Sequence, residues 1–315
     1  AYEMLRSLVG SETCIRDRYA DVPAQTGDTE QSPTPIISIE NLDNYIHDNK
    51  VSVKDLYLQI SSMGNEKPDI VEGNDLPDFN PDDEYLQEIK SPIFYAVQKN
   101  INIQTGQPTI LDFDMQRISQ RINIVFNIRT EGNIKREDLA APIIELSGAC
   151  GRFNIADACL DTTRLYRMAH QVQPDEFTQT GEGTYRCVVH FHTLGVIPSA
   201  AKGHLNGPGI LQVALQVSTP QLDSSGAPVV DEEGNPVKNS RYIYGAINPY
   251  DELTAAQLIE VRDGKIYLRY SKEDVNIEIT TPLVIKADQI VPNDTGMGWQ
   301  PHDPTNPDDD IIIEI

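Results

Sequence analysis

The sequence lacks any apolar run of the roughly 18 residues that a membrane-spanning helix needs, and it is poor in basic residues. Only 25 Lys and Arg stand against 48 Asp and Glu, which gives a formal net charge of −23. Binding to nucleic acid or to an anionic membrane requires clustered Lys and Arg. The composition therefore argues against both kinds of partner and predicts a soluble or surface-displayed module.

Motifs for the common chemistries are also missing. The sequence has no G-x-S-x-G, H-E-x-x-H, G-x-x-x-x-G-K-[ST] or G-x-G-x-x-G pattern, and these mark nucleophilic, zinc-dependent and nucleotide-binding sites. His190 and His192 would share one strand face about 7 Å apart, but a catalytic zinc normally has three protein ligands. We expect solvated histidines, no catalytic residue, no cofactor and no metal site.

Calcium is not expected either. The acidic stretches Asp231 to Asn235 and Asp308 to Asp310 offer oxygen ligands. They lack the D-x-[DN]-x-[DN]-G spacing that encloses the ion. We interpret both stretches as solvated loops.

Cysteine is scarce, with four residues. Cys14 falls within Leu8 to Arg18, which resembles a translated transposase adapter from sequencing-library preparation and departs from it only at Thr13. We expect residues 1–20 to be non-native, with the likeness covering residues 1–18, so that the absence of an export signal is uninformative. The alternative is a native helix from Tyr2 to Val9.

Three cysteines remain, namely Cys150, Cys159 and Cys187. An odd number is poor evidence for a disulfide framework. Pairing of Cys150 with Cys159 through a turn stays open.

The sequence is rich in alternating apolar and polar residues, the period of a half-buried strand. Strands are predicted around residues 51–60, 122–128, 211–217, 259–270, 275–285 and 311–315. In the first, a phase shift at Lys54-Asp55 is typical of a bulge. Asp263-Gly264 suits a type I′ hairpin turn, in which both central residues have positive φ.

Helical spacing is rare. It occurs at Ile39 to Ile46 and at Asp251 to Leu258, where Asp251 is placed to cap the helix. Many short strands with Gly and Pro punctuation predict an all-β fold of antiparallel β-sandwiches. Parallel sheets would need crossover helices that the sequence does not supply.

About 295 native residues are more than one compact core usually holds, which suggests two domains. The polar stretch Gln171 to Gly183 separates two strand patterns. We therefore predict two tandem sandwiches, residues 21–172 and residues 173–315. A surface loop is predicted at Asn65 to Glu88, and a loop or exposed hairpin at Pro220 to Ser240.

The C-terminus ends in an apolar strand after a leash that contains Pro301, Pro304 and Pro307. An unpaired hydrophobic strand is an aggregation template, so it must pair with its own sheet or with that of another subunit. The second alternative is β-augmentation. The candidate assembly residues are Ile311, Ile312, Ile313 and Ile315.

Trp299 is the only tryptophan. It is a candidate for stacking on a sugar ring, and the alternative is an aromatic that pins the C-terminal segment to a sheet.

Several segments together resemble the fimbrillin-like surface proteins of Gram-negative gut anaerobes. They are spread over about residues 36–315 and comprise Leu76 to Pro81, Phe94 to Ala96, Phe113 to Ile122, Glu145 to Gly148, and the tail with Gly298-Trp299 and its isoleucine-rich end. The resemblance implies two transthyretin-like sandwiches, a lipoprotein-type signal, display on the outer membrane and pilus assembly by strand exchange. Only Ile311 to Ile315 can be matched to a functional element of that family.

The sequence thus favours a structural cell-surface protein, a fimbrial (pilus) subunit or accessory adhesin. Its partners would be other fimbrial subunits and surface ligands. Its location would be the outer membrane or a fimbrium. The roles of stalk, tip and anchor subunit are equally open. The alternative is a non-catalytic surface glycan-binding protein that uses Trp299, Tyr242 or Tyr244 as stacking platforms.

Overall fold

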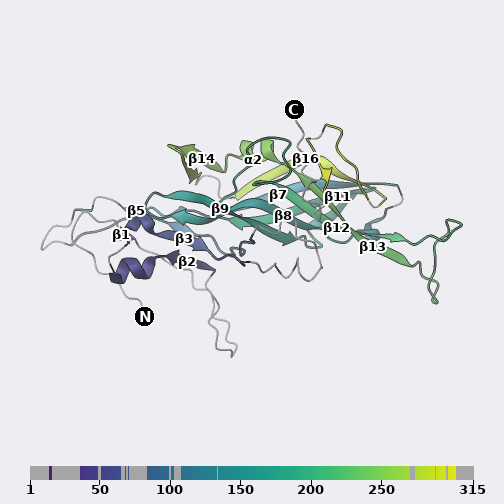
Figure 1. The fold of residues 1–315 in the computed structure, drawn as a ribbon, viewed down its shortest axis with the longest axis horizontal. Coiled ribbons are helices and arrows are strands. Elements are labelled where there is room, and N and C mark those ends of the chain that lie inside the picture. Colours follow the sequence, from purple (N-terminus) through teal and green to yellow (C-terminus); the bar gives the residue numbers. More distant parts are fainter. Residues whose placement is uncertain are drawn as a thin grey trace, which may run out of the picture.

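The computed structural model describes residues 14–15, 36–48, 51–64, 68, 70, 84–98, 101–102, 108–132, 134–269, 274–287, 289–295 and 297–302. Their fold is mostly β, as predicted (Figure 1). The strands of the two large sheets are β2 Ile37–Glu40, β3 Tyr57–Ile60, β7 Gln120–Glu131, β8 Ile143–Asn154, β9 Cys159–Gln171, β10 Phe177–Gly181, β11 Thr184–Thr193, β12 Leu211–Pro220, β13 Lys238–Ile247, β14 Ile259–Arg262, β15 Lys265–Leu268, β16 Asp274–Lys286, β17 Gln289–Ile290 and β18 Gln300–Pro301.

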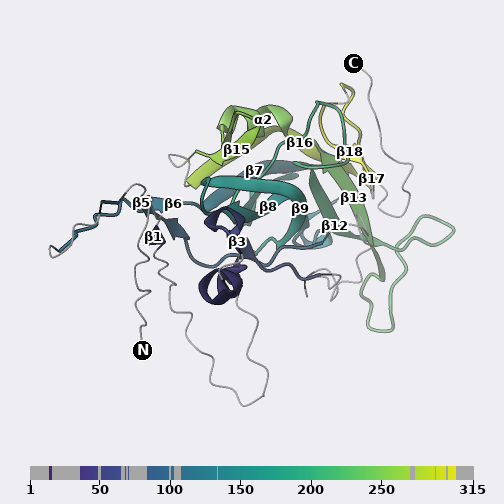
Figure 2. The same ribbon diagram turned by 60° about the vertical axis from the view of Figure 1, so that its left-hand side comes forward.

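These strands form two sheets that pack face to face (Figures 1 and 2). One sheet has the order β10-β11-β7-β16-β17. The other has the order β14-β15-β9-β8-β12-β13-β18, with β3 paired to the far end of β8 and β2 paired to β3. Two small ribbons pair β1 Cys14–Ile15 with β5 Val97–Gln98, and β4 Phe94–Tyr95 with β6 Gln116–Arg117. The first of them includes two residues of the segment predicted to be non-native.

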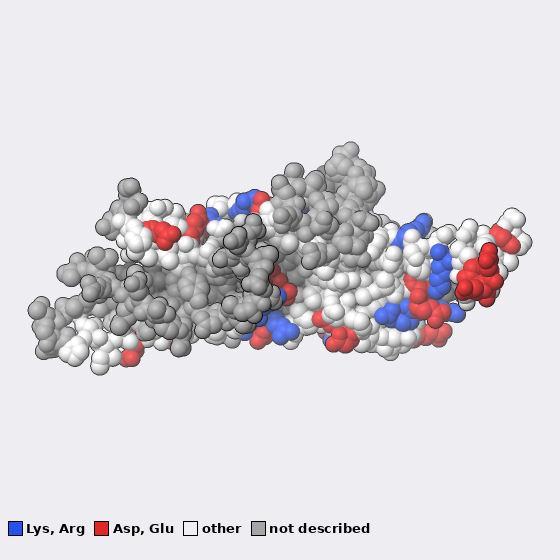
Figure 3. All heavy atoms as spheres, turned by 90° about the horizontal axis from the view of Figure 1, so that it is seen from below, with Lys and Arg blue, Asp and Glu red and all other residues white. Residues whose placement is uncertain are grey.

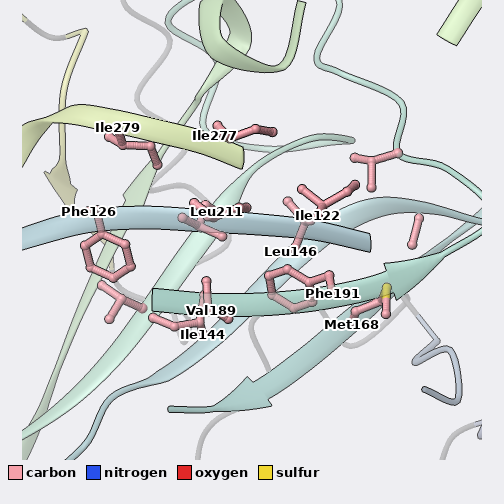
Figure 4. Close-up of a cluster of buried hydrophobic side chains, with 14 of the residues drawn as sticks. Ile122, Phe126, Ile144, Leu146, Met168, Val189, Phe191, Leu211, Ile277 and Ile279 are labelled. Carbon is pink, nitrogen blue, oxygen red and sulfur yellow. The ribbon is translucent and has the colours of Figure 1, made fainter. Parts of the chain in front are cut away.

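The core is formed by apolar side chains at every second position of the strands. In β7 the buried apolar side chains are Ile122, Ile124, Phe126 and Ile128, each at 0% exposure, and the residues between them face outward. They meet inward-facing residues of β8, β11, β12 and β16, such as Leu146, Phe191, Leu211 and Ile277 (Figure 4). Burial of each such side chain stabilises the fold by about 1.5–3 kcal/mol.

The predicted boundary at residues 172/173 runs through this body and is corrected here. β7 lies on the N-terminal side of the boundary, yet it pairs with β11 and β16 from the C-terminal side. β8 likewise pairs with β12. Because strands from both sides complete each other's sheets, the described core is continuous across the boundary.

Most strand pairs are antiparallel, as predicted, but one pair of long strands and the isolated bridge between Tyr85 and Arg167 are parallel. β16 runs parallel to β7 along Asp274 to Lys286. The connection between β7 and β16 is long and passes twice through the opposite sheet, first by β8 and β9 and later by β12 to β15, so it differs from a strand-helix-strand crossover.

The short helices differ in detail from prediction. A 3-10 helix, Val53–Asp55, replaces the predicted bulge, and Ile39 lies in β2, ahead of the π-helix Asn44–Asp48. A further 3-10 helix spans Arg136–Asp138, and α2 spans Tyr250–Ala256. Asp251 does not cap α2. Its carboxylate instead bonds to Lys202 Nζ at 2.6 Å.

Part of the predicted surface loop Asn65 to Glu88 is buried instead. Tyr85 and Leu86 are 2% and 4% exposed.

The disulfide left open by the sequence does not form. Cys150 and Cys159 are free and buried. Cys159 lies opposite Asn154, four residues along β8 from Cys150, or about 13 Å at strand rise, so the pairing left open does not form.

Candidate functional site

The C-terminal segment is the candidate site. Ile311, Ile312, Ile313 and Ile315 lie outside the described residues, so their assembly role stays a prediction. The chain that leads to them is described at residues 289–295 and 297–302.

Trp299 holds this segment in the core. Its side chain is 1% exposed, and its ring lies 5.1 Å from that of Phe126, centroid to centroid. The indole Nε1–H donates to the carbonyl of Thr281 at 3.1 Å. A ring buried in this way is not available to a sugar, so the stacking role is corrected and the pinning role is what the structure displays.

The Thr281 carbonyl is available because β16 is irregular at that point. Its register against β7 shifts between Ile279 and Leu283. Pro282, which lacks an N–H, occupies the irregular stretch, where proline is tolerated in a strand. The sheet thereby leaves an acceptor for the indole.

A closed turn sets the direction of the segment. The Asn293 N–H donates to the Trp299 carbonyl at 3.1 Å, and Gln300 Nε2 donates to the Asn293 carbonyl at 3.2 Å. A Cβ on Gly298 would lie 2.7 Å from Asn293 Cγ, so the close approach requires glycine here. The turn delivers β18 to the edge of β13.

At that edge the chain becomes a strand. Gln300 and Pro301 lie opposite Ala246 and Gly245, and the His302 N–H donates to the Tyr244 carbonyl at 3.0 Å. The backbone is thus fixed up to the last described residue.

A buried polar network lies beside this exit. Arg167 contacts Glu145 at 3.1 Å and Gln212 at 2.5 Å, and Tyr85 donates to Glu145 at 2.5 Å. Gln212 Nε2 lies 3.3 Å from His302 Nε2. Glu145 and Arg167 are 0% and 4% exposed, so the charges are paired away from water. The network connects Tyr85, the middle of the larger sheet and the C-terminal segment.

The predicted face histidines are half-buried and hydrogen-bonded. His190 Nδ1 lies 2.6 Å from Asn123 Oδ1, and His192 Nε2 lies 3.0 Å from Ser119 Oγ. Burial lowers the pKa of both imidazoles. Glu176 lies 3.4 Å from His190 Nε2. Over the described part of the chain, no three His, Cys, Asp or Glu side chains are arranged to hold a metal ion.

The remaining candidates are the two tyrosines proposed for sugar stacking and the acidic stretch near the C-terminus. Tyr242 and Tyr244 are half-buried on β13, with ring centroids 6.3 Å apart and planes at 29°. Asp308 to Asp310 lie outside the described residues. Among the described helices, none has the length and apolarity to cross a membrane.

Sequence reasoning missed one element, a tandem repeat of eight residues. Gln221 to Pro228 reads QLDSSGAP, and Val229 to Pro236 reads VVDEEGNP. The signal is the shared spacing of Asp, Gly and Pro, which marks a repeated turn. Residues 221–237, called the arm below, project from the sandwich between β12 and β13 (Figures 1 and 2).

Several solved structures are similar to this chain, and two of them are described here. Both are Bacteroides ovatus proteins provisionally classed as adhesins, with 11% and 9% identity and a TM-score of 0.36 each. The alignments cover 81% and 79% of this chain, and 72% and 66% of the other chains. No family model matches the sequence. No curated protein matches it either.

Proposed function

We propose that this protein is a structural cell-surface protein without catalytic activity, a fimbrial subunit or accessory adhesin. It would assemble by pairing its C-terminal strand, Ile311 to Ile315, with a sheet of a neighbouring subunit. Its setting would be the outer membrane or a fimbrium.

The observation that carries this proposal is the anchoring of the C-terminal segment. Trp299 is buried and His302 is hydrogen-bonded to β13, so the tail starts from a fixed point on a sheet edge. The tail, residues 303–315, can extend about 40 Å at 3.3 Å per residue. It ends in alternating isoleucines.

An apolar strand of this kind gains stability by pairing with the edge of a sheet. Main-chain hydrogen bonds to a sheet edge supply affinity, and every second side chain fills a pocket. Proline and aspartate in the tail disfavour helix and strand before the isoleucines, which suits a linker between subunits.

Deletion of residues 310–315 tests the proposal. The shortened protein should remain folded by far-UV circular dichroism and Trp299 fluorescence, while sedimentation should detect only monomer where the parent polymerises. A synthetic peptide of residues 309–315 should inhibit polymerisation of the parent. The matched control, Glu314→Gln, removes a charge but no apolar side chain and should still polymerise. Unfolding of the deletion variant would instead assign the strand to its own sheet.

A further inference from the structure

The arm, residues 221–237, is a self-contained structure. Three backbone hydrogen bonds close a ring at its base, each 2.8 Å long: Gln221 donates to Val237, Val237 to Val229, and Val229 to Gln221. Three segments are thereby tied together at equivalent positions of the repeat. Apart from Val229 and Val237, which are half-buried at this junction, every residue of the arm is exposed.

Each repeat closes its own loop in the same way. Asp223 Oδ1 accepts from the N–H groups of Ser225 and Ala227 at 2.8 and 2.9 Å. Asp231 Oδ1 accepts from Glu233 and Asn235 at 3.0 and 2.8 Å. The Ser225 hydroxyl, which donates to Asp223 Oδ1 at 2.6 Å, and next these N–H groups lower the pKa of Asp223, and the Asn235 N–H does most to lower that of Asp231. The acidic stretch at Asp231 therefore has a structural use. The two loops are thus closed by their own hydrogen bonds, and none of their residues belongs to the hydrophobic core.

The repeat also presents an apolar side chain at the same position of each loop. Leu222 is 58% exposed and Val230 is 56% exposed, and they form bridges with Pro228 and Pro236. A loop that its own hydrogen bonds hold in one conformation pays less ordering entropy when it binds than an unstructured segment does. Two such residues on one projecting element are placed to enter pockets of a partner.

Charge identifies the kind of partner. The arm carries Asp223, Asp231, Glu232 and Glu233 and no basic residue. Figure 3 shows acidic side chains at the outermost part of the end that carries the arm, with Lys and Arg side chains nearer the body of the molecule. A second copy of this chain would be repelled, because the whole chain has a net charge of −23. A surface rich in Lys and Arg is complementary.

We propose that the arm is a contact element for a different protein, one that offers apolar pockets within a Lys- and Arg-rich surface, with Leu222 and Val230 as the anchors. This inference rests on the proposed surface role for its setting. The test measures binding of the full-length monomer to a peptide and does not depend on polymerisation. The proposal for the arm and the proposal for the C-terminal strand can therefore fail independently of each other.

The probes are three immobilised peptides of equal length, with alternating Lys and Leu, Lys and Ser, or Glu and Leu. The parent should bind the Lys/Leu peptide at least about tenfold more tightly than either of the others, since one buried Leu or Val side chain is worth that much. Leu222→Ser with Val230→Ser should reduce that affinity to the Lys/Ser level. Glu232→Gln with Glu233→Gln should weaken binding and reduce its salt dependence.

Two controls keep the result specific to the arm. Val261→Ser removes a side chain that is 66% exposed on β14, and it should leave binding unchanged. Replacing residues 221–237 by Asn-Gly joins the paired residues Pro220 and Lys238 through a two-residue turn, and it should abolish the preference for Lys/Leu. The proposal is overturned if the shortened hairpin or the Leu222/Val230 variant binds the Lys/Leu peptide like the parent. It is also overturned if Val261→Ser lowers the affinity as much as the Leu222/Val230 variant does, or if the parent does not prefer the Lys/Leu peptide.

Discussion

The ring of Trp299 lies against that of Phe126, with centroids 5.1 Å apart and planes at 45°. This contact ties the C-terminal segment to β7, the strand that pairs with both β11 and β16. The exit point of the tail is therefore part of the core.

Trp299→Ala should lower the free energy of unfolding by about 3–5 kcal/mol, because it leaves a cavity between the sheets. Trp299→Phe keeps most of the volume and should cost less, mainly the hydrogen bond to Thr281, about 1 kcal/mol. Urea unfolding followed by far-UV circular dichroism measures both. A cost below about 1 kcal/mol for the alanine variant would contradict the core role.

Gly148 and Gly207 form a matched pair. Both have positive φ, +82° and +87°, but a Cβ on Gly148 would lie 2.6 Å from Gly209 N, whereas nothing lies within 4 Å of one on Gly207. Gly207→Ala should cost about 1–2 kcal/mol for the backbone alone. Gly148→Ala should cost a further 1–3 kcal/mol or so for the clash. The register of β8 against β9 shifts between Leu146 and Ala149, next to Gly148. Equal urea midpoints for the two variants would show that the chain at this shift moves to accommodate the added methyl group.

The buried pair of Glu145 and Arg167 predicts strong coupling. Glu145→Gln or Arg167→Met alone should each cost about 3–5 kcal/mol, since the other charge loses its partner inside the protein. The double variant should cost clearly less than the sum in a double-mutant cycle. On the surface, Asp251→Asn breaks the exposed pair with Lys202 and should cost less than about 1 kcal/mol. Additive effects at Glu145 and Arg167 would argue against a coupled network.

His192 should make the fold sensitive to mild acid. Burial, and next the charge of Arg117, lower its pKa below the ordinary 6.5. The unfolded chain therefore takes up the proton first, and the stability contributed by neutral His192 is complete above pH 6.5 and lost as the pH falls through the folded pKa. His192→Gln should flatten this loss in urea unfolding at pH 8, 6.5 and 5. An unchanged pH dependence in the variant would show that His192 is not the group responsible.

Much of the fold follows from local patterns. The alternation from Ile122 to Ile128 predicts β7, and Asp263-Gly264 predicts the β14–β15 hairpin, in which both residues do have positive φ, 49° and 73°. Asp251 is not the cap because α2 begins at Tyr250, with Pro249 at the N-cap position, and the contact of Asp251 with Lys202 is one that the sequence does not reveal. The arm lies within the stretch Pro220 to Ser240, which is predicted as a loop or exposed hairpin, but the hydrogen bonds that join its two repeats are decided only by the tertiary structure.

The sequence by itself determined the period of two, the turn residues and the all-β class, because each depends on neighbours a few residues apart. Only the tertiary structure decided that β16 runs parallel to β7, that strands on both sides of residues 172/173 share sheets, and that Trp299 is buried. The physical reason is that alternation specifies which face of a strand leaves water but not which strand lies beside it. That choice depends on how all the apolar faces can be buried together.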